Sequence, residues 1–305
     1  MAWVYLIGYP VQLSGRALQL VGALVVLILG ATMARGLFMF GLLGNFLCFL
    51  GASFAIFCGT HLFLFGRKIT ARRAEELMRR DERNPVLFLR SFRDDKKTSR
   101  VIEKNSDFRR SFGKTKLAMY VPGVPGDLTF SSVTTEEEML ANELKRIGPC
   151  IAVGSPGERL PPLGMARMYF ENEHWEEGVR EYIERADLVV MRAGVTDGFL
   201  RELRMAVKFL EPKRLLILLP SGIENEQAVV PDEPGGPTTF REIAGKILQR
   251  ELPVLSGGEM SEGSLAGIIW FESDWTPKIK MFEGGTIKGL FEPLSKSYSH
   301  SGAFH

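Results

Sequence analysis

Three polar segments each follow a short apolar run, and together they hold the residues best suited to chemistry. They are Arg90–Asp95, Gly154–Gly164 and Arg192–Gly198, and the last leads into a helical pattern that carries Glu202. Guanidinium groups bind phosphates and carboxylates through paired hydrogen bonds. A carboxylate stabilises positive charge that develops during a reaction. These residue types offer anion binding and cation stabilisation, at a site that the surrounding elements must assemble.

The apolar runs that precede these segments have the character of buried strands. Each is short, aliphatic and nearly continuous, as strands of a parallel sheet covered on both faces are. Five such runs occur, at Pro85–Arg90, Cys150–Val153, Asp187–Met191, Arg214–Leu219 and Gly267–Phe271.

Helical patterns lie between these runs. Thr135–Ile147 opens with a Thr cap and an acidic first turn, followed by apolar residues at helical spacing. Three further ranges have apolar residues on one helical side: His174–Ala186, Gly198–Leu210 and Thr238–Gln249. The alternation predicts an α/β fold, a doubly wound, flavodoxin-like sheet of five parallel strands with helices on both faces.

Function in such sheets lies beyond the carboxyl ends of the strands, where the strand order reverses. In the flavodoxin-like order this point lies between the first and third strands, so Arg90–Asp95 and Arg192–Gly198 meet there. Simpler interpretations stay open. Arg90–Asp95 fits a salt-bridged loop, and Glu202, between Arg201 and Arg204, fits a solvated helix residue.

Four segments in order resemble the Toll/interleukin-receptor (TIR) domain family. Leu89–Asp95 resembles the opening strand and loop of that family, and Ser155-Pro156-Gly157 is similar to its Pro-Gly loop. His174–Met191 looks like its Ile-x-x-Ala-x-x-Leu-Ile-Val passage. Asp197–Leu203 is similar to its Ser-x-Trp-Cys-x-x-Glu-Leu segment, with Glu202 at the Glu. The resemblance covers roughly residues 85–219.

The resemblance implies one of two activities. Some TIR domains are scaffolds that signal by self-association, and others cleave the nicotinamide–ribose bond of NAD with the aligned Glu. It implies Glu202 as the catalytic residue, with NAD as a substrate and no cofactor. Arginines would meet the pyrophosphate and Phe92 would stack on a ring. The candidate substrate-binding residues are Arg90, Ser91, Phe92, Arg93, Asp94, Gly154, Pro156, Gly157, Arg159 and Asp197.

Three functions therefore stay open. The first is a membrane-anchored TIR-like effector that hydrolyses NAD when it oligomerises. The second is a non-catalytic TIR-like module for nucleotide sensing or self-association. The third is an enzyme related to nucleoside deoxyribosyltransferases, which share the sheet and a catalytic Glu. The partners expected are the lipid bilayer, further copies of the chain and a nucleotide ligand.

The first 66 residues contain no Lys, Asp or Glu and only two Arg, Arg16 and Arg35. They predict a transmembrane hairpin with spans at about 17–34 and 42–65, since roughly 20 apolar residues cross a bilayer. A cleaved signal peptide is disfavoured by the second long run. A single span with a re-entrant segment is the alternative. Small residues at Gly51, Ala55 and Gly59 predict close helix packing on one face.

Seven Lys and Arg residues between positions 67 and 83 follow the second span. This excess predicts that the exit is cytoplasmic, which places the chain in a membrane, a bacterial inner membrane by the resemblance, with its C-terminal domain in the cytoplasm. Residues 67–84 are expected to form a basic helical stalk. The TIR-like domain is assigned to 85–275, with an insertion at 96–132, and residues 276–305 to a tail.

The remaining composition excludes some functions. A formal net charge of +2 over 305 residues leaves no nucleic-acid footprint. None of the three cysteines has metal-ligand spacing, so no metal site is expected, and Cys150 is assigned to the core.

Overall fold

The computed structural model describes residues 2–35, 40–71, 74–91, 101–102, 134–154, 163–171, 174–228, 238–254 and 265–281. The chain forms two compact units, one of residues 1–71 and 101–134 and the other of residues 72–100 and 135–305. Each unit is described by itself below.

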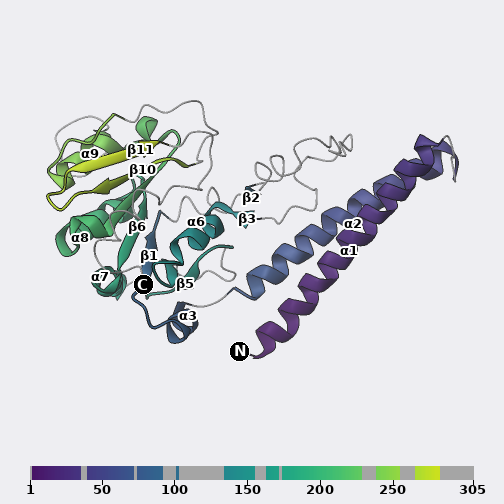
Figure 1. Cartoon of the computed structure of the whole chain (residues 1–305), viewed down its shortest axis with the longest axis horizontal. Coiled ribbons are helices and arrows are strands. Elements are labelled where there is room, and N and C mark those ends of the chain that lie inside the picture. The colour runs from purple at the N-terminus through teal and green to yellow at the C-terminus, as the bar shows by residue number, and fades with distance from the viewer. Residues whose placement is uncertain are drawn as a thin grey trace. The chain divides into compact units, whose positions relative to one another are not determined.

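The first unit contains two long helices that run side by side in opposite directions (Figure 1). They are α1 (Ala2–Ala34) and α2 (Gly41–Ile69). Both exceed the predicted spans, and α1 begins at Ala2 rather than near residue 17. At about 1.5 Å per residue, either helix is longer than the roughly 30 Å hydrocarbon core of a bilayer.

Small residues that recur every seven positions bring the two helices together. A Cβ on Gly15 would lie 2.6 Å from the Gly59 oxygen, and one on Gly22 would lie 2.7 Å from the Ala52 oxygen. A seven-residue repeat keeps one seam facing the partner helix. Of the predicted small residues, Gly59 lies in this contact, where a Cβ would be 2.7 Å from the Gly15 oxygen, but Gly51 does not. A Cβ on Gly51 would meet no described atom within 4 Å.

The outward faces of the hairpin are apolar. Many of its large side chains are 48% exposed or more, among them Leu13, Leu20, Leu24, Leu42, Leu43, Phe46, Leu47 and Phe54. Two described helices, Ile7–Ala34 and Gly41–Ile69, are long and apolar enough to cross a membrane. In the most apolar 18-residue stretch of each helix, only 17% and 11% of the residues are buried, respectively. The apolar core helix of a soluble protein is mostly buried.

The second unit is built on a seven-stranded sheet in the order β11-β10-β7-β6-β1-β4-β5. Its strands are β1 (Val86–Leu89), β4 (Cys150–Val153), β5 (Ala166–Met168), β6 (Leu188–Arg192), β7 (Leu215–Pro220), β10 (Leu265–Phe271) and β11 (Pro277–Met281). The first five of these are parallel, while β10 and β11 are antiparallel to their neighbours. Two-residue strands also occur, β2 (Val101–Ile102), β3 (Thr134–Thr135), β8 (Gln227–Ala228) and β9 (Thr238–Thr239).

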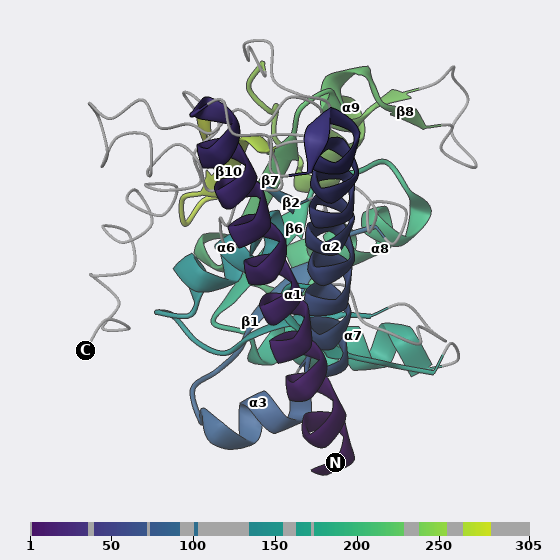
Figure 2. The ribbon, with the colours of Figure 1, turned by 90° about the vertical axis from the view of Figure 1, so that its right-hand side faces the viewer.

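Helices cover both faces of this sheet, unequally. They are α3 (Ala74–Arg80), α6 (Glu136–Leu144), α7 (Trp175–Arg185), α8 (Asp197–Phe209) and α9 (Phe240–Leu248), with short 3-10 turns at η4 (Pro212–Arg214) and η5 (Ile223–Asn225). Residues of α3, α7, α8 and α9 share one core with Leu87 and Leu89. Leu140 and Leu144 of α6 pack on the opposite face with Val86 and Phe88. Figures 1 and 2 show α6 on the other side of the sheet from α8.

The sheet corrects the prediction of five parallel strands. The α/β class, the five predicted strands and the helices on both faces are confirmed, but the sheet is mixed. β10, predicted as parallel, runs antiparallel to β7. Two strands of this sheet were missed: β5, and β11, which lies in the part assigned to a tail. Of the insertion at 96–132, only Val101–Ile102 is described.

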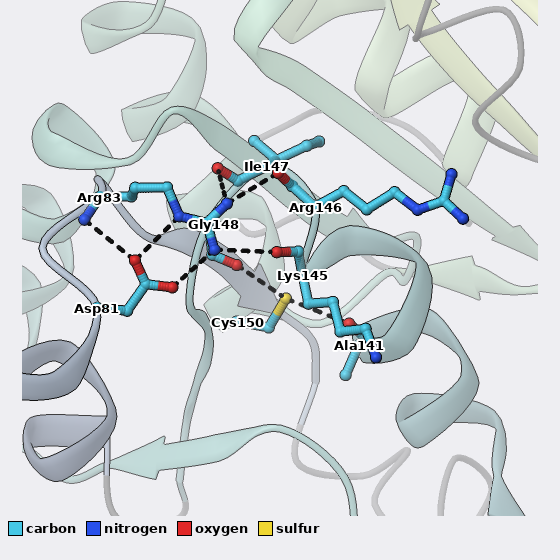
Figure 3. A network of polar contacts seen from close by, with 8 residues as sticks. All are labelled: Asp81, Arg83, Ala141, Lys145, Arg146, Ile147, Gly148 and Cys150. Atoms are coloured by element: carbon cyan, nitrogen blue, oxygen red, sulfur yellow. Dashed lines mark hydrogen bonds and ion pairs between the residues drawn. The ribbon is translucent and has the colours of Figure 1, made fainter. Parts of the chain in front are cut away.

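The predicted stalk is not one continuous helix. α2 ends at Ile69, where the Thr70 N–H bonds back to the Gly66 oxygen, and a separate helix begins at Ala74. Arg83 belongs to the α/β unit (Figure 3). Its guanidinium donates to both carboxylate oxygens of Asp81, at 2.9 and 2.7 Å. It also donates to main-chain oxygens just beyond α6, those of Lys145, Arg146 and Ile147, so it holds a helix terminus.

Candidate functional site

The carboxyl ends of β1 and β6 are adjacent, as predicted for the first and third strands. Leu89 of β1 is in register with Met191 of β6, and β4 lies on the other side of β1. The strand order therefore reverses beside β1, where open α/β sheets bind ligands. Arg90 directly follows β1, and Arg192 is the last residue of β6.

Alternation along the strands sends neighbouring side chains to opposite faces. Arg90 and Arg192 face α6, because both make ion pairs with its first turn. Leu89 and Met191 belong to the core on the α8 side, as does Ala193. The switch point therefore has two sides with different chemistry.

The α6 side is a buried ion-pair cluster centred on Glu137. One oxygen of this carboxylate accepts from Arg167 of β5 at 2.9 Å and from Arg90 at 3.4 Å. The other oxygen accepts from the Met165 N–H at 2.8 Å. A Cβ on Gly164 would lie 2.4 Å from the same carboxylate, so glycine is required for this close approach.

Glu136 completes the cluster by pairing with Arg192. Burial raises the pKa of Glu136, while the charge and the hydrogen bond of Arg192 oppose that shift. The helix itself begins at Thr135, in a capping box with Glu138. Thr135 also donates to the Leu163 oxygen at 3.0 Å, so the first turn of α6 is fixed to the 163–165 segment.

These charges are almost fully desolvated. The side chains of Arg90, Glu137, Arg167 and Arg192 are 1–2% exposed, and that of Glu136 is 5% exposed. Burying an ion costs several kcal/mol, and removing one partner of a buried pair costs about 3–5 kcal/mol. Nε and Nη1 of Arg167 have no hydrogen-bond partner among the described residues. The cluster fixes how α6, β1, β5 and β6 meet.

Glu202 lies on the α8 side and is 4% exposed. It faces the core from α8, next to Phe199 and Ala206, which are both buried. Its Oε2 atom is buried and has no hydrogen-bond partner among the described residues. Desolvation raises the pKa of Glu202 to about 8. The carboxyl group is therefore mostly protonated at pH 7 in this state.

The structure brings some predicted site residues together and separates others. Arg90 and Glu202 end on opposite faces of the sheet, since one contacts α6 and the other lies on α8. Ser91, two residues beyond the end of β1, is 8% exposed. Asp197 is exposed in the first turn of α8, after the Thr196 cap.

Among the candidate residues of the second predicted loop, Gly154 is the one that the structure describes. Its N–H donates to the Met168 oxygen at 2.8 Å, and a Cβ there would lie 2.3 Å from the Tyr169 ring. Gly154 thus permits a close ring contact at the end of β4. The other candidate residues lie outside the described part of the chain: Phe92, Arg93, Asp94, Pro156, Gly157 and Arg159.

Sequence reasoning missed most of the ion-pair cluster. Glu136 and Glu137 were interpreted only as an acidic first turn that favours the helix dipole. Arg192 was read as the start of a loop, although it ends β6. Arg167 stands between apolar residues in β5, and this alternation was the available signal for a strand with one charged, buried face.

Cys150 follows the expectation of a small buried side chain. Its thiol donates to the main-chain oxygens of Ala141 and Gly148, both at 3.6 Å (Figure 3). Burial raises the pKa of Cys150 to about 12, so the thiol is not a nucleophile at neutral pH.

No protein-family model, no curated protein and no solved structure matches this chain. The likeness to TIR domains therefore rests on the sequence motifs alone. The fold supports a more general description of the chain. Two apolar N-terminal helices and an α/β sheet domain are compatible with a membrane-anchored α/β domain.

Proposed function

We propose that this chain is a membrane-anchored, TIR-like effector that hydrolyses the nicotinamide–ribose bond of NAD when copies of it associate. The observation that carries the proposal is Glu202, a core-facing carboxyl group with an unpartnered oxygen on the helix that follows the third predicted strand. Buried acids with a strongly raised pKa concentrate at functional sites. Glu202 is also the residue that the TIR-like motif assigns to catalysis.

The proposed reaction needs one carboxylate. The bond between ribose C1′ and the nicotinamide nitrogen breaks, and nicotinamide leaves with the bonding electrons as a neutral base. Positive charge develops on the ribose, where an ionised Glu202 stabilises it. Water then adds to C1′ and releases a proton to solvent. The positively charged nicotinamide ring of the substrate would favour the ionised carboxylate when it binds nearby.

The described state fits a resting form of such an enzyme. Glu202 is shielded from water, and Arg90 is held by Glu137 rather than available to a pyrophosphate. Substrate access therefore requires the carboxyl end of the sheet to rearrange. Self-association is the proposed trigger, and confinement in a membrane plane raises the local concentration that it needs.

The membrane part of the proposal rests on the hairpin and its basic flank. The exposed faces of α1 and α2 are apolar, and cations follow α2. Arg83 is engaged with α6, which leaves six basic residues from Arg67 to Arg80 for the orientation rule. That excess favours a cytoplasmic α/β domain.

Nicotinamide release by the full-length chain at high density in lipid vesicles tests this function. Glu202→Gln keeps the volume of the side chain and removes its charge, so release should fall on the order of 100-fold. Glu184→Gln is the matched control, because the Glu184 side chain is 50% exposed on the neighbouring helix α7. Equal release by the wild type and Glu202→Gln would refute the enzyme.

Arg90 and Arg192 each form an ion pair within the α/β unit. These ion pairs favour a second candidate, a non-catalytic TIR-like module that senses a nucleotide or self-associates. Both guanidinium groups already contact carboxylates of α6, as they would in a structural core. Nucleotide binding without nicotinamide release, in the wild type and in Glu202→Gln alike, would support this module. Transfer of a base between deoxyribosides would instead indicate an enzyme related to nucleoside deoxyribosyltransferases.

A further inference from the structure

Arg16 is the one charged residue inside the apolar stretch of α1 that passes for a membrane span. Its guanidinium carbon lies 3.9 Å from the centre of the Phe63 ring on α2. Arg67 of α2 approaches the same ring, at 5.8 Å. Guanidinium groups from both helices therefore lie near one aromatic side chain.

The hairpin supplies no countercharge for Arg16. The first acidic residue of the sequence is Glu75, beyond the end of α2. Within the described residues Arg16 makes one hydrogen bond, to the Gln19 side-chain oxygen at 3.3 Å. A guanidinium has five N–H donors, so most of its hydrogen-bonding capacity remains for another acceptor.

The surroundings of Arg16 are a polar belt across the two helices. Gln19 donates to Thr60 at 2.8 Å, and Gln12 donates to Thr70 at 2.8 Å. After Arg16, Ala17–Ala34 is an uncharged run of 18 residues, about 27 Å long as a helix. The belt therefore lies at one boundary of the hydrocarbon core, where lipid phosphates are found.

Arg16 lies deeper than the basic flank of α2. It stacks on Phe63, which precedes Arg67 on α2 by about one helical turn. Phe63 therefore lies about 6 Å further into the hairpin than Arg67 does. A charged group at that depth needs an anionic partner or access to the interface. Basic pockets between helices on the cytoplasmic side bind anionic headgroups.

We propose that Arg16 and Arg67 together hold the phosphate of an anionic phospholipid, between α1 and α2 at the cytoplasmic boundary. This inference rests on the proposed membrane anchor. Phe63 positions the guanidinium of Arg16 through its ring face, and Gln19 fixes it from the same helix. The lipid supplies the negative charge that the hairpin lacks.

Native mass spectrometry of the full-length chain, released from nanodiscs with equal phosphatidylcholine and phosphatidylglycerol, tests the site. The wild type should retain phosphatidylglycerol in preference to phosphatidylcholine. Arg16→Gln should reduce that preference about fivefold, in line with the contribution of one basic residue at a membrane surface. Arg35→Gln, at the opposite end of the hairpin, is the control and should retain lipid as the wild type does.

Equal lipid retention by Arg16→Gln and the wild type would overturn the site. Arg16→Lys keeps the charge without the planar fork, so it should retain an intermediate amount. If Arg16→Gln fails to insert, wild-type retention by Arg16→Lys overturns the proposal. Excess inorganic phosphate should leave the bound lipid in place, and its loss would assign the site to a soluble anion instead.

Vesicle flotation separates this inference from the membrane anchor. A chain that floats with neutral and with anionic vesicles, yet shows no preference for phosphatidylglycerol, overturns the lipid site alone. A chain that floats with neither overturns the anchor and the lipid site together.

Discussion

Two buried glutamates near the carboxyl edge of the sheet have different electrostatic surroundings on its two faces. Towards α6, the Glu137 carboxyl group is shared between two guanidinium groups. Towards α8, Glu202 lies in an apolar environment with an unpartnered oxygen. Neither arrangement is encoded by residue type, because both depend on which strand faces which helix. The sequence pointed to Glu202 as a candidate only through its motif.

The raised pKa of Glu202 makes stability depend on pH. The folded chain holds the proton up to about pH 8, whereas the unfolded chain releases it near pH 4.5. The folded state binds more protons between these values, so the free energy of unfolding falls as pH rises through this window. The loss amounts to at most about 5 kcal/mol.

Urea unfolding of the full-length chain at pH 5 and pH 8.5 measures this dependence. Glu202→Gln has no titrating group at this position, so it should lose less stability across the window and exceed the wild type at pH 8.5. Parallel pH profiles for the wild type and Glu202→Gln would show that Glu202 is not buried in a neutral form.

Elements were predictable where apolar periodicity marks them. The strands β1, β4, β6 and β7 and the helices α6 to α9 follow runs that the sequence displays, and the Thr135 cap is in place. Strand direction is not recorded in such runs. The residues of β10 are as apolar as a parallel strand, yet it pairs antiparallel with β7. β11 escaped because its Lys278 and Lys280 alternate with less polar residues at an edge.

The hairpin seam is an element-scale feature that a single residue tests. A side chain at Gly59 would collide with the Gly15 oxygen, since even a Cβ would lie 2.7 Å from it. Gly59→Val should therefore separate the helices and lower stability by about 1–3 kcal/mol. Thermal unfolding in detergent, followed by loss of helical circular dichroism, measures the effect.

Gly51→Val is the matched control for this substitution. A Cβ on Gly51 meets no described atom within 4 Å, so the change should leave the midpoint nearly unaltered. A similar loss for Gly51→Val and Gly59→Val would contradict a seam at Ala52 and Gly59.

At the scale of the whole molecule, the chain consists of two units, each with its own packing. The hairpin has small residues inside and large apolar residues outside, the reverse of a soluble helix pair. The α/β unit has its own two cores, one on each face of its sheet. Composition alone divided the chain near residue 66, because a bilayer and water select opposite surfaces.

We propose that the hairpin crosses a membrane and leaves the α/β unit on one side of it. The most direct measurement is labelling of introduced cysteines by an impermeant maleimide in sealed vesicles of known sidedness. One cysteine replaces Arg35 at the hairpin turn, and another replaces the exposed Glu184 in the α/β unit. We expect the two positions to react from opposite sides of the membrane. Labelling of both from the same side, or release of the chain by an alkaline wash, would contradict it.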